Sequence, residues 1–159
     1  MSTDRRQRRA ELIEATLASN REVGALSIFF HGAVASQLGL TPAETKCIDI
    51  ILRSTNPDRV TAGWLAEHSG LTTGAITTLV DRLEQVGLVR RQRSSEDRRK
   101  VYVQLLPKCF ERLAPLYESL GKAMQQLLDE YSEEQLLLIV NYQKRCAEIL
   151  ALETAKLKK

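Results

Sequence analysis

The side chains best suited to chemistry in this sequence are arginines, lysines and threonines, and they gather in two places. Residues 90–100 read RRQRSSEDRRK, with basic residues on both sides of a short polar and acidic centre. Residues 72–78 read TTGAITT, with small hydroxylated side chains at both ends. Guanidinium groups bind phosphates through directed hydrogen bonds, and threonine hydroxyls and methyls can contact base edges. These residue types favour binding to a nucleic acid, although a charge run is also a common solvated surface.

Few residues in this sequence are of the types and spacings that catalysis or metal binding requires. The sequence has no phosphate-binding glycine loop, no metal-ligand motif and no nucleophile elbow, and its only histidines are His31 and His68. We therefore expect neither catalysis nor a metal nor a cofactor. Cys47, Cys109 and Cys146 have no spacing that suggests pairing, so we expect them to pack as small hydrophobes in a reducing compartment.

Length, composition and charge favour a water-soluble protein. The chain has 159 residues, 43% hydrophobic and 27% charged, which is enough for one core or for two small cores that share an interface. Its net charge of +3 is too small to identify a partner. The N-terminus is charged, and no apolar run approaches the roughly 20 residues of a bilayer span. We expect a cytoplasmic protein without a membrane partner.

The threonines of residues 72–78 belong to a predicted helix-turn-helix. A first helix over Ala62–Ser69 ends at Gly70, which can adopt the positive φ of the turn, and Thr72 caps a second helix. We expect the apolar side of this motif to be buried, namely Leu71, Ile76, Leu79, Val80, Leu83 and Val86. The exposed side of the second helix is predicted to consist of Thr73, Thr77, Thr78, Asp81, Arg82 and Gln85. Such a helix end suits insertion into the DNA major groove, but an ordinary helical hairpin could use the same residues for packing and capping.

The basic run occupies the tip of a predicted hairpin that directly follows the second helix. Apolar residues alternate with polar ones over residues 101–105, as in a strand with two different faces. A ribbon in this position would be a wing, whose arginines can enter a narrow DNA minor groove. The residues that flank the tip and can reach phosphates are Arg90, Arg91, Arg93 and Lys100. Because an acid facing DNA is unfavourable unless it is paired, we expect Asp97 to hold a neighbouring arginine, such as Arg98, in a fixed orientation.

Long amphipathic helices are predicted on both sides of this motif. The first spans roughly residues 12–38, with apolar or small residues at every third or fourth position. A capping box at residues 41–44 begins a short helix. Pro107 begins a fifth helix, in which Pro115 predicts a kink or a late start, and a second capping box at residues 132–135 begins the last helix. The outer helices carry apolar stripes that a monomer of this size would struggle to cover.

These elements together predict the fold class. We expect a mainly α protein, a winged helix-turn-helix with a two-stranded β-wing, flanked by long N- and C-terminal helices. The segment over residues 71–105, LTTGAITTLVDRLEQVGLVRRQRSSEDRRKVYVQL, resembles the multiple-antibiotic-resistance regulator (MarR) family of bacterial winged-helix repressors. The matching motifs are DRL at 81–83, GLVRR at 87–91 and DRR at 97–99. One departure is Leu105-Leu106-Pro107 in place of the family's Leu-Thr, which removes a helix cap and leaves the DNA-binding motifs unchanged.

The resemblance implies a homodimer that binds a palindromic operator in double-stranded DNA. Residues 1–39 and 107–159 would provide the dimerisation helices, over 5–38 and 108–157, and residues 40–106 the DNA-binding domain. The second helix of the motif would read the major groove, with Thr72, Thr73, Thr77, Thr78 and Arg82 as candidate contacts. Arg99 would enter the minor groove, and Arg98 would contact phosphate or steady the recognition helix.

The resemblance also implies control by a ligand. Many members of the family release DNA when a small, often aromatic or phenolic, ligand binds between the dimer helices and the winged domain. The candidate lining residues are Phe30, His31, Cys47, Ile51 and Trp64, although a helical histidine such as His31 is more often a structural residue. The sequence thus predicts a ligand-responsive, homodimeric, DNA-binding transcriptional repressor. The alternative is a winged helix that serves protein contact alone, which would not need Arg98 and Arg99.

Overall fold

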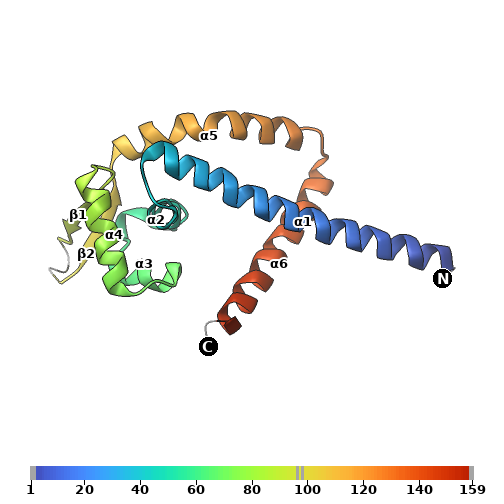
Figure 1. The fold of residues 1–159 in the computed structure, drawn as a ribbon, viewed down its shortest axis with the longest axis horizontal. Helices are drawn as coiled ribbons and strands as arrows, with labels where there is room; N and C mark the ends of the chain where they lie inside the picture. Colours follow the sequence, from blue (N-terminus) through green and yellow to red (C-terminus); the bar gives the residue numbers. More distant parts are fainter. Residues whose placement is uncertain (1–2, 96, 98, 158–159) are drawn as a thin grey trace. The chain divides into compact units, whose positions relative to one another are not determined.

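The structure is a computed structural model that describes residues 3–95, 97 and 99–157, and of residues 3 and 58 only the backbone. Its elements are, in chain order, α1 (Thr3–Leu38), α2 (Pro42–Leu52), the short 3-10 helix η1 (Pro57–Arg59), α3 (Ala62–Ser69), α4 (Thr73–Gln85), β1 (Val89–Arg93), β2 (Val101–Leu105), α5 (Pro107–Leu128) and α6 (Glu133–Leu157) (Figure 1). This order confirms the predicted mainly α fold with a helix-turn-helix and a two-stranded wing.

The chain divides into two compact units, Met1–Leu113 and Ala114–Lys159. The boundary lies inside α5, next to Pro115. Because α5 begins at Pro107 and continues through this proline, it does not start late; of the two predicted effects of Pro115, the late start is wrong and the kink stays a prediction. Proline removes one helical hydrogen bond, but the neighbouring residues are mostly good helix formers, which accounts for the continuation. The functional division of the chain into three segments, 1–39, 40–106 and 107–159, stays a prediction.

Local capping signals determine where the helices of the first unit begin and end. The Oγ1 of Thr41 accepts a hydrogen bond from the N–H of Glu44 at 3.3 Å, and Oε2 of Glu44 accepts from the N–H of Thr41 at 2.6 Å, which confirms the predicted capping box. Helix α3 ends at Gly70, whose φ is +74°. The hydroxyl of Thr72 then caps α4 by accepting from the N–H of Ala75 at 3.3 Å. The turn predicted between α3 and α4 is therefore confirmed.

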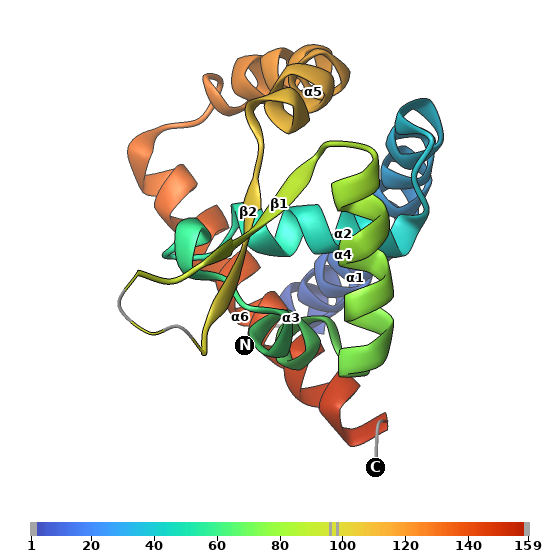
Figure 2. The same cartoon turned by 90° about the vertical axis from the view of Figure 1, so that its left-hand side faces the viewer.

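The core of the first unit lies among α2, α3, α4 and the root of the wing (Figure 2). Its most buried large side chains, each at most 1% exposed, include Ile48, Ile51, Leu65, Ile76, Leu83 and Val103. Three residues predicted to be buried are not: Leu79 is half-buried, Leu71 is 37% exposed and Val86 is 36% exposed. Leu71 and Val86 stand outside the helical residues of α4, where helical spacing no longer places a side chain on the buried face.

The wing is an antiparallel ribbon whose register runs from Val89 opposite Leu105 to Arg93 opposite Val101. Figure 2 shows β1 and β2 lying side by side. The outer edge of β2 is also held, since the N–H of Val103 donates to the carbonyl of residue 60 at 2.7 Å. Of the predicted apolar face, Val103 is 1% exposed and Leu105 half-buried, whereas Val101, next to the tip, is 38% exposed.

The second unit contains the rest of α5 and α6. The N–H of Ser132 donates to Oε1 of Gln135 at 2.8 Å, and the N–H of Gln135 donates to Oγ of Ser132 at 3.3 Å, which confirms the second capping box. Within the described part of α6, no residue is buried. Side chains that are 45% to 72% exposed include Leu137, Leu138, Val140, Ile149, Leu150 and Leu152. A single chain therefore leaves this apolar surface in contact with water.

Across the part of the chain that the structure describes, no single helix is long and apolar enough to cross a membrane. The pair Asp4–Leu38 and Pro42–Leu52 meets the requirements of length and composition only jointly, across a bend of 102°. Such a pair is weak evidence for a span, because the core helix of a globular unit passes the same test, and α2 is largely buried.

Candidate nucleic-acid interface

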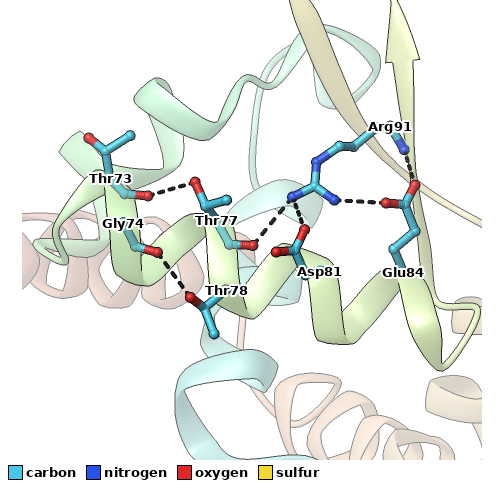
Figure 3. A network of polar contacts seen from close by, with 7 residues as sticks. All are labelled: Thr73, Gly74, Thr77, Thr78, Asp81, Glu84 and Arg91. Atoms are coloured by element: carbon cyan, nitrogen blue, oxygen red, sulfur yellow. Dashed lines mark hydrogen bonds and ion pairs between the residues drawn. The ribbon is translucent and has the colours of Figure 1, made fainter.

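The N-terminal half of α4 exposes threonines to solvent. Thr72, Thr73, Thr77 and Thr78 are all exposed. The hydroxyl of Thr77 donates to the carbonyl of Thr73 at 2.9 Å, and that of Thr78 donates to the carbonyl of Gly74 at 3.2 Å (Figure 3). Because a hydroxyl has one hydrogen, each oxygen keeps its acceptor capacity, and the methyl groups remain for apolar contact. These side chains suit the amino groups of adenine and cytosine and the methyl group of thymine.

Arg82, a predicted recognition-helix contact, is paired with a buried acid of α2. Its Nε lies 3.0 Å from Oε1 of Glu44, whose side chain is 1% exposed, whereas that of Arg82 is 54% exposed. The other carboxylate oxygen of Glu44 accepts from the N–H of Thr41. Both oxygens of this buried acid are therefore engaged, and the pair ties α4 to α2.

Arg91, a predicted phosphate contact, reaches several acceptors on α4 (Figure 3). Its Nη1 lies 2.7 Å from Oε2 of Glu84, and its Nη2 lies 2.6 Å from Oδ1 of Asp81 and 3.3 Å from the carbonyl of Thr77. The backbone N–H of Arg91 donates to Oε1 of Glu84 at 2.7 Å. The structure thus places this guanidinium against two carboxylates of α4.

The contacts of Arg91 change how both partners hold their protons. The backbone hydrogen bond from Arg91 is the largest cause of the lowered pKa of Glu84; burial opposes it, and the guanidinium adds to it. Burial acts to lower the pKa of Arg91, but the hydrogen bonds and charges of Glu84 and Asp81 outweigh it and raise that pKa. Each group therefore stabilises the charged form of the other.

The other cations of the wing that the structure describes lie toward solvent. The side chain of Arg90 donates to Oε1 of Gln104, across the ribbon, from Nε at 3.1 Å and from Nη2 at 3.0 Å. Arg90, Arg93, Arg99 and Lys100 are all exposed. This placement leaves them accessible to a polyanion, and their contacts with phosphates or a minor groove stay predictions.

Asp97 organises the backbone of the wing tip. Its Oδ1 accepts from the N–H of Arg99 at 3.0 Å, and its own N–H donates to Oγ of Ser94 at 3.2 Å. Its carbonyl accepts from the N–H of Lys100 at 2.9 Å. The acid therefore shapes the turn that carries Arg99. Arg98, which we expected Asp97 to orient and to contact phosphate or the recognition helix, lies outside the described residues.

The five predicted ligand-lining residues lie in different environments. Cys47 and Ile51 belong to the core and are 1% and 0% exposed. Trp64 is half-buried and stacks on a histidine of its own helix, with ring centroids 3.7 Å apart. Phe30 is half-buried and meets the ring of the exposed His31 edge-on, at 5.8 Å. A ligand would reach Cys47 or Ile51 only if the core opened, so a pocket formed by these residues stays a prediction.

Two of the three cysteines are buried, as predicted. Cys47 and Cys109 are each 1% exposed, and Cys146 is half-buried. Burial raises the pKa of the Cys47 thiol, and it raises that of Cys109 to about 11. Both thiols are therefore protonated near neutral pH and pack as small hydrophobes. Among the residues that the structure describes, no group of three or more His, Cys, Asp and Glu side chains could hold a metal ion.

The partners of the two interface arginines could not be read from the sequence. Glu84 lies seven residues after Thr77 and three after Asp81, a spacing that places all three on one helix face. That spacing was a usable signal for a shared face, but it does not reveal that the face meets β1. Glu44 was predicted only as a helix cap, because its partner Arg82 is distant in the sequence.

Comparison with known proteins assigns the chain to a family. A model of the MarR family matches residues 38–100, which contain α2, α3, α4 and β1. YcgE of Bacillus subtilis, described as an uncharacterized HTH-type transcriptional regulator, is 38% identical over 158 residues, which cover 99% of both chains. A MarR family protein from Bacillus stearothermophilus has a structure that matches with a TM-score of 0.56 at 22% identity, over 98% of this chain and 99% of its own.

A second solved structure, a mutant of S. aureus MepR bound to an oligodeoxyribonucleotide, matches with a TM-score of 0.58. It covers 85% of this chain and 97% of its own, and at 16% identity it supports the fold alone. From the family model and the full-length relative, the chain belongs to the MarR family of transcriptional regulators. It is a DNA-binding regulator of transcription and not an enzyme.

Proposed function

We propose that the protein is a homodimeric repressor that binds a palindromic operator sequence-specifically and is released by a small aromatic or phenolic ligand. The observation that supports it best is the combination of exposed threonines at the start of α4 with a cationic wing that Arg91 joins to the same helix. Helix and wing together form one surface with both base-edge and phosphate chemistry.

The DNA contacts divide between the two grooves. Thr72, Thr73, Thr77, Thr78 and Arg82 contact base edges and phosphates in the major groove. Arg99 enters the adjacent minor groove, while Arg90, Arg93 and Lys100 contact phosphates. The exposure of these side chains supports this assignment, and so does the turn around Asp97 that carries Arg99 at the wing tip.

The surface of the second unit supports the proposed dimerisation. Leu137, Leu138, Ile149, Leu150 and Leu152 are each more than half exposed in a single chain, and apolar surface of this extent is unusual in a monomer. A second copy of the chain would cover these side chains. The two copies of α4 could then occupy half-sites about one DNA turn, or about 34 Å, apart.

A ligand would act by changing which dimer geometry is populated. It weakens DNA binding only by the difference between its affinities for the two geometries. Trp64 is the single tryptophan and is half-buried on α3, so its fluorescence is a convenient reporter of ligand binding near the helix-turn-helix. A phenolic compound that changes this fluorescence should also release the protein from its duplex.

The test is a binding titration against a palindromic duplex, selected first from a random pool, and against its scrambled version, at several salt concentrations. Specific binding should exceed binding to the scrambled duplex by about 10³-fold or more. Arg99→Ala should weaken binding and lower the salt slope by about 0.9, the value for one lost phosphate contact. Lys156→Ala, at an exposed pair near the end of α6, is the matched control for loss of one cation.

The alternative is a winged helix that serves protein contact alone. It predicts weak binding that never separates the palindrome from the scrambled duplex, and no effect of Arg99→Ala on affinity or salt slope. A reporter gene placed behind the selected duplex completes the test, since a repressor lowers its transcription and a phenolic inducer restores it.

A further inference from the structure

Arg91 joins the first strand of the wing to three positions of α4 (Figure 3). Its partners Thr77, Asp81 and Glu84 follow one another at intervals of four and three residues, so they lie on a single face of the helix. The guanidinium meets both carboxylates, and the backbone N–H of Arg91 meets the second oxygen of Glu84. Side chain and backbone of one residue are therefore both attached to the recognition helix.

This arrangement does not suit a phosphate contact. The guanidinium is 29% exposed, and both of its terminal nitrogens already have acceptors on α4. Two carboxylates surround one cation, so the local charge is negative and would repel a phosphate approaching Arg91. Arg90, on the opposite face of the same strand, is exposed and donates to the neutral amide oxygen of Gln104 instead of to a carboxylate. Adjacent arginines therefore have different roles.

The position of Arg91 in the ribbon determines what its contacts fix. Residues 86–88 alone connect α4 to β1 along the chain. The root of the ribbon is also held by its buried residues and by the bond of Val103 to the carbonyl of residue 60, but that bond does not involve α4. Arg91 lies in the middle of β1, opposite Val103 of β2, and its bonds attach this part of the ribbon directly to α4. The same ribbon carries Arg99 at its tip. A change of angle at Arg91 therefore displaces Arg99 relative to α4.

We propose that Arg91 is a positioning residue that, with Asp81 and Glu84, locks the wing onto the recognition helix so that both enter DNA as one rigid unit. The proposal rests on the proposed DNA-binding function for its readout, and it assigns Arg91 a role other than phosphate binding. Its consequence is that the contribution of Arg99 to affinity depends on residues that do not touch DNA.

The test is a double-mutant cycle between Arg91→Met and Arg99→Ala, measured as affinity for the selected duplex. Arg91→Met should weaken binding about three- to tenfold, as expected for a partly exposed charge network, with little change of salt slope. In the Arg91→Met background, Arg99→Ala should lose less affinity than it does in the wild type. Arg90→Met is the matched control, and its effect should add to that of Arg99→Ala and lower the salt slope.

Glu84→Gln separates positioning from electrostatics, and it also serves if Arg91→Met does not fold. Removing an acid beside DNA should tighten binding if charge alone matters. Positioning instead predicts weaker binding and a smaller contribution of Arg99. The proposal would be overturned if Arg91→Met lowered the salt slope by about 0.9 and its loss of affinity simply added to that of Arg99→Ala. That result would instead indicate a phosphate contact.

Hydrogen exchange of the free protein distinguishes failure of this proposal from failure of the proposed function. Backbone amides of β1 and β2 should exchange faster in Arg91→Met than in the wild type, with those of α2 unchanged. If the wild type binds no duplex specifically, the proposed function fails. The exchange of the β1 and β2 amides still tests whether Arg91 holds the wing against α4. Unchanged exchange in the wing overturns the proposal whatever the protein binds.

Discussion

The Nε of Arg82 lies 3.0 Å from Oε1 of Glu44, a carboxylate whose side chain is 1% exposed. The second oxygen of Glu44 accepts from the N–H of Thr41 at the start of α2. A buried carboxylate is stable only when its charge is compensated and its lone pairs are occupied, and these two contacts do both. Arg82 therefore holds α4 against α2 whether or not its exposed part also contacts DNA.

Removing the cation of this pair should destabilise the fold. Arg82→Met leaves the charge of Glu44 buried with one partner fewer, and because Arg82 is itself 54% exposed we expect a loss of about 1–2 kcal/mol in the free energy of unfolding. The double variant Arg82→Met with Glu44→Gln should lose less, since the neutral amide needs no counter-charge. Urea unfolding measures both.

The control for that experiment is Arg53→Met, which breaks the exposed pair of Arg53 with Asp49 on α2. Exposed pairs contribute little, so its loss should stay below about 1 kcal/mol. Equal losses for Arg82→Met and Arg53→Met would show that burial of Glu44 has no energetic consequence and would contradict the interpretation.

The hydroxyl and methyl of Thr77 can be tested separately. Thr77→Val keeps the shape and removes the oxygen, whereas Thr77→Ser keeps the oxygen and removes the methyl. If the oxygen accepts from a base amino group, Thr77→Val should weaken binding to the preferred duplex by about 1 kcal/mol, or about fivefold, and leave the scrambled duplex unaffected. Thr77→Ser should instead lose discrimination at a thymine.

Thr16→Val is a matched control for the same substitution. Thr16 is exposed on α1, and its hydroxyl donates to the carbonyl of Leu12 at 2.7 Å, as that of Thr77 does to the carbonyl of Thr73. The two valine variants should have similar thermal stability. Equal effects on DNA affinity would mean that Thr77 has no role at a base edge.

Features of this fold that depend on neighbouring residues could be predicted from the sequence. Both capping boxes, at Thr41 and at Ser132, involve residues three apart, and Gly70 needs only its own φ of +74°. Pro115 shows the limit of such rules. Its local effect predicted a kink or a late start, but the helix starts at Pro107, because the helix-forming tendency of a 22-residue segment outweighed one missing hydrogen bond.

The interface was only partly predictable for a different reason. A charge pattern identifies cations but does not reveal which of them already have a partner. Arg91 and Arg90 are equivalent in sequence, yet they lie on opposite faces of β1, so only Arg91 meets the carboxylates of α4. That difference depends on the angle between ribbon and helix, which is a tertiary property. Exposed Thr77 and Thr78, in contrast, follow from helical periodicity alone.

The apolar surface of α6 predicts how the dimer can be broken. Leu138 is 72% exposed in a single chain, so Leu138→Glu should leave an isolated chain folded. In a dimer interface it would bury an unpaired carboxylate, at a cost of several kcal/mol, and raise the dimer dissociation constant on the order of 100-fold. Sedimentation equilibrium measures this change.

The control is Gln143→Glu, which adds the same charge at an exposed polar position of α6 and should leave the dimer intact. A dimer that is unaffected by Leu138→Glu would exclude this surface as the interface.

The contacts of Glu84 predict a specific dependence of stability on pH. The backbone N–H of Arg91, helped by the guanidinium and opposed by burial, lowers the pKa of Glu84 below its ordinary value of 4.5. A group whose pKa is lowered on folding stabilises the protein fully above its unfolded pKa, and this contribution disappears as pH falls through the folded pKa. The melting temperature of the wild type should therefore exceed that of Glu84→Gln by a constant amount from about pH 7 to about pH 5.5, and the difference should shrink toward zero below about pH 4.

Since Glu84 is 39% exposed, the difference in melting temperature corresponds to less than about 1 kcal/mol in the free energy of unfolding. Thermal unfolding of both proteins over this range measures it, with Glu118→Gln, at an exposed pair with Lys122, as the control. A difference that persists unchanged at the lowest pH would mean that Glu84 stabilises the wing through its shape and not through its charge.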